Sequence, residues 1–264
     1  MIITNKLLKA SIVLVTCIFS MGCKQNASVG TNETSTASSP AAEASGGVLV
    51  FSKTSGYYHE SIPDGIAAIQ KLGSENGFAV DTTKDASKFA ESNLKRYKAI
   101  IFLSTTQDVL NSEQEKAMEN YIKGGGGFVG VHAAADTEYE WPWYNKLVGA
   151  YFKSHPNNPN VRKAIINVTD KSHPSTKGLP DKWERSDEWY NYKDINPDLK
   201  VLAKLDETSY EGGENGDNHP IIWYHAYDGG RAFYTGGGHT KESFQDPVFM
   251  EHLLGGIQYA MGGD

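Results

Sequence analysis

The stretch GGGGFVGVHAAAD, residues 124–136, has the pattern of a buried strand that ends in a sharp turn, with a histidine at the corner. In many α/β hydrolytic folds the matching corner, where a strand turns into a helix, carries a Ser or Cys nucleophile. Here that position is His132. Both cysteines, Cys17 and Cys23, precede the predicted folded part, so a thiol nucleophile is excluded. The stretch therefore favours chemistry by histidine, with or without a metal.

Short apolar strands alternate with helical patterns on either side of this stretch. Apolar residues recur at helical spacing from residue 62 to 76, with Pro63 in the first turn. A second helix is predicted to begin with a capping box from Ser112 to Glu115 and to stop at the four glycines. The strands between them are predicted at residues 48–51, 78–80, 99–103 and 128–131. This alternation predicts a parallel sheet with helices on both faces.

The second half of the chain has a different pattern, in which several strands are joined by turns. These strands are predicted at residues 164–168, 201–205, 220–224 and 231–234, and some are expected to be antiparallel. A last helix is predicted after Asp246, with Pro247 in its first turn. The expected fold class is therefore α/β, with a mainly parallel central sheet and a β-rich later portion, in one domain over residues 47–264.

The N-terminus has the features of an export signal. Lys6 and Lys9 precede a short apolar run, which is followed by a small residue and then Cys23. Residues 1–22 resemble a bacterial lipoprotein signal peptide with Cys23 as the lipidated residue, and an ordinary signal peptide is the alternative. Residues 23–46 lack aromatic residues and are rich in Ser, Thr, Ala and Gly, which predicts a flexible tether. We therefore expect a lipid-anchored protein of the bacterial cell envelope, facing the periplasm or the outside.

The charge balance restricts the partners of the chain. It has 25 basic and 32 acidic side chains, and loss of residues 1–22 would remove Lys6 and Lys9 and make it more acidic. Nucleic acid and anionic lipid need a basic face, so neither is an expected partner, and membrane contact is expected only through the lipid anchor. A small-molecule partner remains, and the sequence gives no indication of an oligomeric state.

Three histidines are expected at one rim of the sheet, because ligands of such sheets bind at the carboxyl ends of the strands. His59 follows the first strand, His132 ends the fourth, and His239 follows a late strand and a glycine run. His132 and His239 are predicted to act in acid–base catalysis, with His59 and Glu188 completing the site or binding a cation. The same three histidines could hold a divalent metal such as zinc, although no short His-x-x-x-His spacing is present. For each histidine taken alone, a solvated or core role is the alternative.

Aromatic and acidic residues near these histidines suggest the ligand. Tyr58, Trp141 and Tyr190 are aromatic candidates for substrate contact, and Asp136 and Asp187 are acidic ones. Flat rings beside carboxylates suit a sugar, whose C–H faces stack while its hydroxyls form hydrogen bonds, and core packing of the rings is the alternative. Two further histidines, His155 and His173, each precede a proline and are assigned to turns.

Several separated motifs occur together in an order that resembles one known family. They are residues 48–52, 56–62, 125–132, 173–174, 187–190, 220–223 and 230–234, with Gly238-His239. Together they resemble the ThuA-like, or trehalose-utilization, family over residues 47–262. The resemblance implies a flavodoxin-like fold similar to class I glutamine amidotransferases, with His132 at the amidotransferase cysteine position. It also implies a link to bacterial disaccharide catabolism, often beside oxidoreductases that make 3-keto sugars.

These observations favour an exported enzyme that acts on a glucoside, disaccharide or 3-keto-glycoside by isomerisation, elimination or hydrolysis. The alternative is a non-catalytic carbohydrate-binding or scaffold lipoprotein, because a fold does not dictate a function. Amidotransferase activity is disfavoured, because the predicted domain has no cysteine to attack glutamine.

Overall fold

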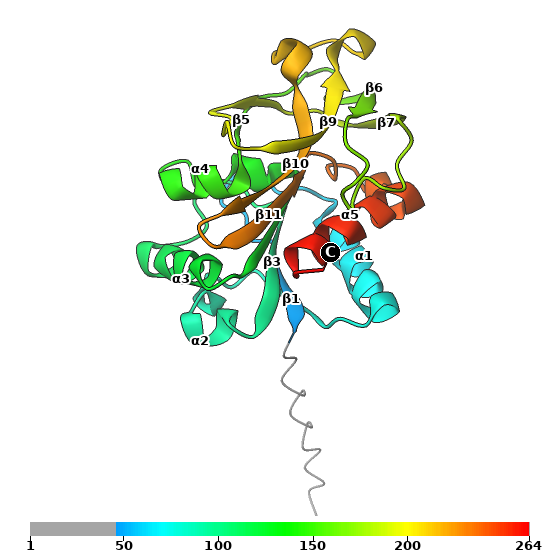
Figure 1. Ribbon diagram of the computed structural model, residues 1–264. Helices are drawn as coiled ribbons and strands as arrows, with labels where there is room; N and C mark the ends of the chain where they lie inside the picture. Colours follow the sequence, from blue (N-terminus) through cyan, green and yellow to red (C-terminus); the bar gives the residue numbers. More distant parts are fainter. Residues whose placement is uncertain (1–45, 264) are drawn as a thin grey trace, which may run out of the picture. The chain divides into compact units, whose positions relative to one another are not determined.

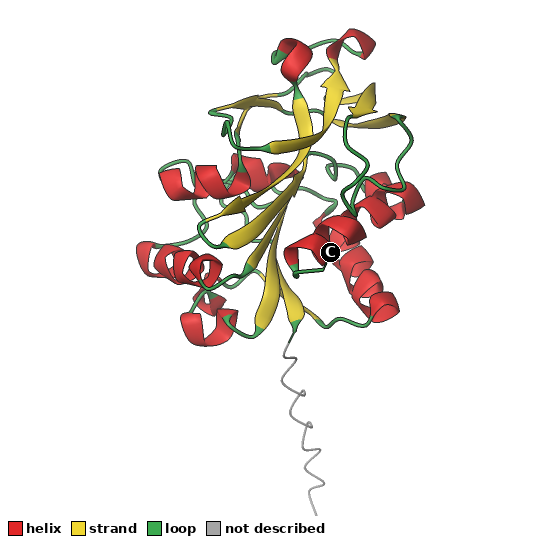
Figure 2. Ribbon diagram, viewed as in Figure 1, coloured by secondary structure: helices red, strands yellow, loops and turns green. Residues whose placement is uncertain are grey.

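The computed structural model describes residues 46–263, and its centre is a nine-stranded sheet (Figures 1 and 2). The strand order is β2-β1-β3-β4-β11-β10-β9-β6-β7. The predicted signal peptide, Cys23 and nearly all of the predicted tether lie outside the described residues. Within the described part, no helix is both long enough and apolar enough to cross a lipid bilayer.

The first half of the chain builds the parallel part of the sheet. Neighbours run parallel from β2 through β1, β3 and β4 to β11, which returns from the end of the chain to lie beside β4. Of these strands, β1, β3 and β4 are buried on both faces, which is why their sequences are continuous apolar runs. Their bounds are β1 Gly47–Phe51, β2 Val80–Thr83, β3 Tyr97–Leu103, β4 Gly127–Val131 and β11 Gly230–Thr235.

The later portion extends the same sheet with antiparallel strands, as the sequence predicts. The antiparallel pairs are β11 with β10, β10 with β9, β9 with β6, and β6 with β7. A separate two-stranded sheet pairs β5 with β8. The bounds are β5 Tyr151–Ser154, β6 Val161–Val168, β7 Lys182–Glu188, β8 Asn191–Lys193, β9 Lys200–Asp206 and β10 Pro220–Tyr227. The predicted α/β fold class is thus confirmed.

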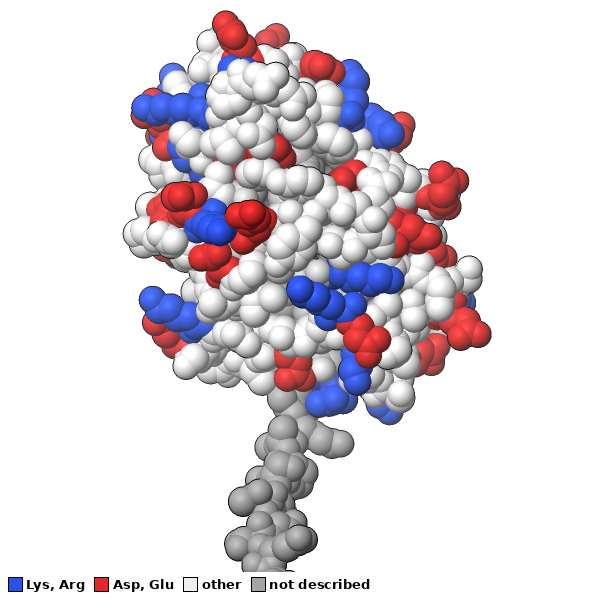
Figure 3. Space-filling model, turned by 180° about the vertical axis from the view of Figure 1, so that it is seen from behind, with Lys and Arg blue, Asp and Glu red and all other residues white. Residues whose placement is uncertain are grey.

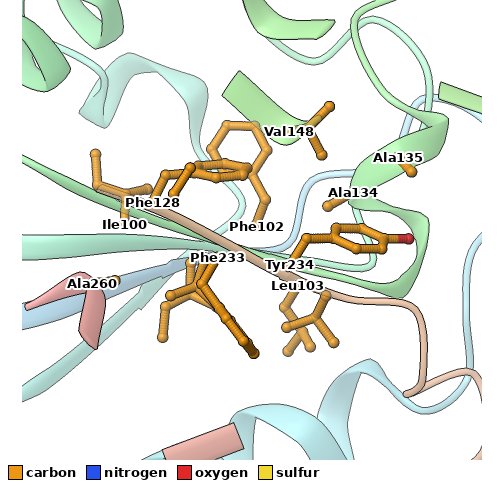
Figure 4. Close-up of a cluster of buried hydrophobic side chains, with 14 of the residues drawn as sticks. Ile100, Phe102, Leu103, Phe128, Ala134, Ala135, Val148, Phe233, Tyr234 and Ala260 are labelled. Atoms are coloured by element: carbon orange, nitrogen blue, oxygen red, sulfur yellow. The ribbon is translucent and has the colours of Figure 1, made fainter. Parts of the chain in front are cut away.

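Helices cover both faces of the parallel part. Helices α1 and α5 contact each other and lie on one face, whereas α2, α3 and α4 lie on the other (Figure 1). Figure 4 shows the alternation beneath them: Phe102 and Phe128 project to one side of the strands and Phe233 to the other. The bounds are α1 Ile62–Asn76, α2 Glu91–Leu94, α3 Ser112–Lys123, α4 Pro142–Val148 and α5 Pro247–Ala260. Short 3₁₀ helices are η1 Ala86–Lys88, η2 His132–Asp136, η3 Glu207–Ser209, η4 Gly216–Asn218 and η5 Glu242–Gln245.

Some element boundaries differ from the prediction. The capping box of α3 is formed one residue earlier than predicted, by Asn111 and Gln114. The Asn111 side chain accepts from the backbone N–H of Gln114, and the Gln114 side chain accepts from the backbone N–H of Asn111. Asn caps a helix as well as Ser, so the pattern alone did not fix the register. Strand β2 begins at Val80 rather than Phe78.

The aromatic segment after residue 139 contains a helix that the sequence pattern did not predict. Part of it forms α4, because Pro142 occupies the first turn and Leu147 and Val148 are buried. The helix ends at Gly149, whose φ of 101° lies in the left-handed region that favours glycine.

Candidate functional site

The structure brings the three rim histidines and Glu188 together. The ring centroids of His59 and His132 are 4.9 Å apart, those of His59 and His239 5.1 Å, and those of His132 and His239 5.2 Å. One potential ligand atom from each histidine and one carboxylate oxygen of Glu188 all lie within 4.8 Å of one another. We call these four residues the histidine–glutamate cluster. It joins the carboxyl ends of β1, β4 and β11 to the end of β7.

His132 is held at the corner that the sequence predicts. Its φ of 50° is in the left-handed region, which is rare for a non-glycine residue and is found preferentially at functional sites. Its Nδ1 hydrogen-bonds the Gly236 carbonyl at 3.0 Å, and its own carbonyl accepts from the Tyr234 hydroxyl at 2.7 Å. Because a carbonyl can only accept, Nδ1 carries the proton and Nε2 faces the cluster with its lone pair when the ring is neutral.

Glu188 lies between two of the histidines. Its Oε2 is 3.3 Å from His132 Nε2 and 3.1 Å from His239 Nδ1, and its Oε1 accepts from the Asn160 amide at 2.6 Å. Burial would raise the pKa of Glu188, but hydrogen bonds and charges from both histidines outweigh it and lower the pKa. Burial likewise would lower the pKa of His239, yet the Glu188 carboxylate raises it above the ordinary value. The carboxylate is therefore ionised and pairs with a basic imidazole.

His59 has the opposite electrostatics. Burial and then the neighbouring charges of His132 and His239 lower its pKa to about 2, so its ring is neutral at pH 7. Its side chain is buried, and its Nδ1 has no hydrogen-bond partner among the described residues. A buried polar atom without a partner requires an explanation, and a bound ion is one of the usual ones.

The spacing of the ligand atoms suits a tetrahedral ion. His132 Nε2, His239 Nδ1 and Glu188 Oε2 are separated from one another by 3.3, 3.1 and 3.3 Å. Zinc binds such atoms at about 2.0–2.1 Å, which places neighbouring ligands of a tetrahedron about 3.3 Å apart. The backbone carbonyl that fixes the His132 tautomer is a partner commonly found behind zinc-bound histidines. The cluster is thus suited to a divalent cation as well as to proton transfer.

A pocket of about 400 Å³ leads to the cluster. Its walls combine aromatic rings with amides and two carboxylates, and none of the described residues that line it is Lys or Arg. Its lining residues are Tyr57, His59, Asp136, Phe152, His155, Asn157, Asn158, Pro159, Asn160, Glu188 and Tyr190. A larger cavity of about 700 Å³, near Lys98 and Tyr121, lies at the opposite end of the sheet. No histidine of the described part of the chain lines it, so the smaller pocket is the candidate site.

Two of the five residues predicted to contact substrate line the pocket, and three do not. Asp136 and Tyr190 line the pocket. Asp136 Oδ1 accepts from the Tyr139 hydroxyl at 2.5 Å, and burial raises the pKa of its carboxyl. The ring of Tyr190 packs on that of His132, with centroids 4.3 Å apart.

The other three predicted contacts lie elsewhere. Tyr58 is 43% exposed and lies against Lys84, and its neighbour Tyr57 lines the pocket instead. Trp141 is buried in an aromatic stack with Trp143 and Tyr144, so core packing explains it. Asp187 is fully buried, and its oxygens are taken by hydrogen bonds within the protein.

Sequence reasoning missed His155 and Asn160. We assigned His155 to a His-Pro turn, but it lines the pocket with Nε2 3.6 Å from Glu188 Oε1, while its Nδ1 bonds the Pro156 carbonyl. The amide-rich run from Asn157 to Asn160 was the sequence signal that could have identified this part of the pocket. His173, by contrast, is buried against Tyr224 and Phe233 and does not line the pocket.

Two buried histidines away from the cluster are expected to make the stability of the fold sensitive to acid. Burial lowers the pKa of His173 to about 4 and that of His252 to about 3. Unfolding exposes both rings and restores a pKa near 6.5, so the unfolded state binds more protons between pH 6.5 and 4. We therefore expect the free energy of unfolding to fall by about 1.4 kcal/mol per histidine per pH unit below pH 6. Urea unfolding at pH 7.5, 6, 5 and 4.5 measures this, and a free energy independent of pH would contradict it.

Comparison with a family model and comparison with solved structures both identify ThuA proteins as relatives of this chain. A family model described as ThuA, trehalose utilisation, matches residues 47–260. The structure is similar to a ThuA-like protein from Bacteroides uniformis, with 26% identity and a TM-score of 0.70 over 85% of this chain and 94% of that chain. A ThuA-like protein from Parabacteroides merdae has 22% identity and a TM-score of 0.64, over 82% and 90% of the two chains.

A more distant match shows how widely the fold occurs. A β-galactosidase from Bacillus circulans has 14% identity and a TM-score of 0.53, over 84% of this chain and 32% of that chain, a likeness of fold alone. Among curated proteins, no relative matches the chain.

Proposed function

The chain belongs to the ThuA family, whose trehalose-utilisation description indicates a role in sugar catabolism, and from this premise we propose that it is an enzyme acting on a glucoside, disaccharide or 3-keto-glycoside. The observation that supports catalysis is the histidine–glutamate cluster, in which an ionised carboxylate and a basic imidazole stand beside a neutral one. Groups with pKa values shifted in opposite directions within one pocket are typical of acid–base sites.

The pocket supports a neutral sugar as the ligand. Tyr57, Phe152 and Tyr190 offer ring faces or edges, and Asp136 and the asparagines offer hydrogen-bond partners for hydroxyls. Its volume of about 400 Å³ lies within the usual range of small-molecule sites. No Lys or Arg lines the pocket within residues 46–263, which disfavours phosphorylated sugars, because a phosphate is normally held by cationic side chains.

The proposed chemistry is proton transfer next to a carbonyl. A keto group at C3 of the sugar acidifies the neighbouring C–H, so a positioned base can remove that proton without a covalent intermediate. His132 and His239 are the proposed acid–base pair, and Glu188 holds the charge of the protonated imidazole. Isomerisation, elimination and hydrolysis can each follow from this first step.

The cluster is also a proposed site for one divalent cation such as zinc. His59, His132 and His239 would supply nitrogen ligands and Glu188 an oxygen ligand. A cation held there would polarise an oxygen of the sugar. In that case the histidines serve as ligands, and the acid–base work passes to other groups that line the pocket, such as Asp136 and His155.

The location of the protein is part of the proposal. We propose that Cys23 is lipidated and that the domain is held at the bacterial cell envelope by residues 23–46. The sequence before the domain supports this: a basic start, a short apolar run and a small residue before the cysteine.

Replacing His132 by Ala tests the catalytic assignment. We expect turnover of 3-keto-disaccharides to fall by about 1,000-fold, because the substitution removes either one member of the acid–base pair or one ligand of the cation. Elemental analysis is expected to find about one zinc per wild-type chain and none in the variant. His225→Gln is the matched control, since His225 is buried on β10 and bonds the Lys146 carbonyl outside the pocket.

Two outcomes would overturn the assignment. Turnover that is unchanged in His132→Ala would remove His132 from the chemistry. Calorimetric binding of sugar that survives loss of all three cluster histidines, with no turnover by the wild type, would favour the non-catalytic sugar-binding alternative.

A further inference from the structure

Asp187 is the most heavily hydrogen-bonded carboxylate beside the cluster. Its Oδ1 accepts from the backbone N–H groups of Glu188 and His239, both at 3.0 Å. Its Oδ2 accepts from the Gly238 N–H at 2.9 Å, from the Ser243 hydroxyl at 2.8 Å and from Arg185 Nη2 at 3.2 Å. The side chain is fully buried and does not line the pocket. Two of its five donors are therefore the backbones of cluster residues.

The segment Gly236–His239, which we call the glycine loop, connects this carboxylate to all three histidines. The Gly236 carbonyl bonds His132 Nδ1, and the Gly238 carbonyl accepts from Ser61, two residues after His59. Gly238 has a φ of 116°, and a Cβ on Gly237 would lie 3.2 Å from Asp187 Oδ2. Glycine is thus favoured where the loop approaches the carboxylate. Movement of this loop would displace the imidazole of His239, which belongs to it, and that of His132, which it hydrogen-bonds.

The ion pair between Asp187 and Arg185 is costly to bury. Only 7% of the Arg185 side chain is exposed, and its guanidinium lies over the rings of Trp183 and Phe249 at 4.7 and 4.4 Å. A buried ion pair often contributes less stability than apolar residues of the same size, so its presence calls for another role. We propose that Asp187, held by Arg185 and Ser243, is a positioning residue that fixes the glycine loop and so aligns His132, His239 and Glu188. The proposal deepens the proposed function and rests on it for the cation readout alone.

Asp187→Asn tests this role while keeping the shape of the side chain. The new amide nitrogen cannot accept from the backbone or from Ser243, so the glycine loop loses part of its support. We expect zinc affinity, measured by competition with a chromophoric chelator, to fall by about 10- to 100-fold. In the metal-free protein we expect the ¹⁵N shifts of the His132 and His239 imidazoles to move. The imidazole shifts do not depend on zinc or on any substrate.

Glu138→Gln is the matched control for a purely structural carboxylate. Glu138 is also buried, and its Oε1 accepts from the backbone N–H groups of Val109 and Leu110, but it lies outside the pocket. We expect the Glu138→Gln variant to unfold at a lower urea concentration than the wild type, with unchanged zinc affinity and unchanged imidazole shifts in the cluster. If Asp187→Asn does not fold, Ser243→Ala removes a single bond to Asp187 and is expected to weaken zinc binding by about 3-fold.

The outcomes separate this inference from the proposed function. Wild-type zinc affinity and wild-type imidazole shifts in folded Asp187→Asn, or in Ser243→Ala if that is the variant that folds, would overturn the positioning role. A wild-type protein that binds no zinc would instead remove the proposed cation site, and the imidazole shifts would still decide whether Asp187 aligns the cluster.

Discussion

Glu188→Gln is expected to lower kcat/KM for a 3-keto-disaccharide by about 1,000-fold. The amide is neutral, so it cannot balance a protonated imidazole or ligate a cation as a carboxylate does. Glu188 raises the pKa of His239 more than Asp187 does, so that pKa is expected to fall in the variant. Steady-state kinetics and an NMR titration of His239 measure the two effects.

Glu184→Gln is the control on the same strand. Glu184 lies on β7 as Glu188 does, but it is exposed and pairs with Lys163 at the surface, 2.7 Å away. A surface ion pair contributes little, so we expect wild-type kinetics from this variant. Full activity of Glu188→Gln would show that the cluster carboxylate has no part in turnover.

Trp223→Ala is expected to lower the free energy of unfolding by about 3–5 kcal/mol. Trp223 is completely buried on β10, stacks on Tyr234 at a centroid distance of 4.2 Å, and donates from Nε1 to the Val148 carbonyl at 2.8 Å. The variant leaves a cavity and removes the indole donor of that carbonyl. Urea unfolding measures the loss. Because Tyr234 bonds the His132 carbonyl, a fall in activity is also expected.

Trp143→Ala provides the comparison for this stability effect. Trp143 is only partly buried and donates to Asp228 near the surface, so its loss is expected to cost less than half as much as the loss of Trp223. Equal effects of the two substitutions would contradict the assignment of Trp223 to the centre of the core.

The parallel half of the fold was predictable because its signals are local. Continuous apolar runs identify β1, β3 and β4, and helical spacing with Pro63 identifies α1. The meeting of His59, His132 and His239 followed from one rule, that side chains after parallel strands share an edge of the sheet. The rule needs only the order of strands and loops, not their detailed geometry.

The rest of the site depends on tertiary placement that no local pattern encodes. His155 and Asn160 reach the pocket because the connection from β5 to β6 passes over it. Asp187 and Glu188 are neighbours on β7, yet one is buried behind the cluster and the other enters it, as strand alternation dictates. Tyr57 lines the pocket and Tyr58 does not. Both lie in a loop, where the side-chain alternation of a strand cannot predict which of them faces the pocket.

On the face seen in Figure 3, acidic and basic side chains are interspersed. The expectation that nucleic acid is not a partner remains a prediction. Binding of a labelled duplex at low salt measures it, and micromolar affinity would contradict it.

Both ends of the described chain emerge at the edge of the sheet remote from the pocket. β1 starts at Gly47, and α5 ends with the Ala260 carbonyl against the start of β4 at Gly127. His59 and His132 follow the other ends of these strands, each about 17 Å away along the strand. A bead, chip or fused protein joined beside Gly47 or Ala260 therefore leaves the opening of the pocket unobstructed, which makes the immobilised domain suitable for screening glycans.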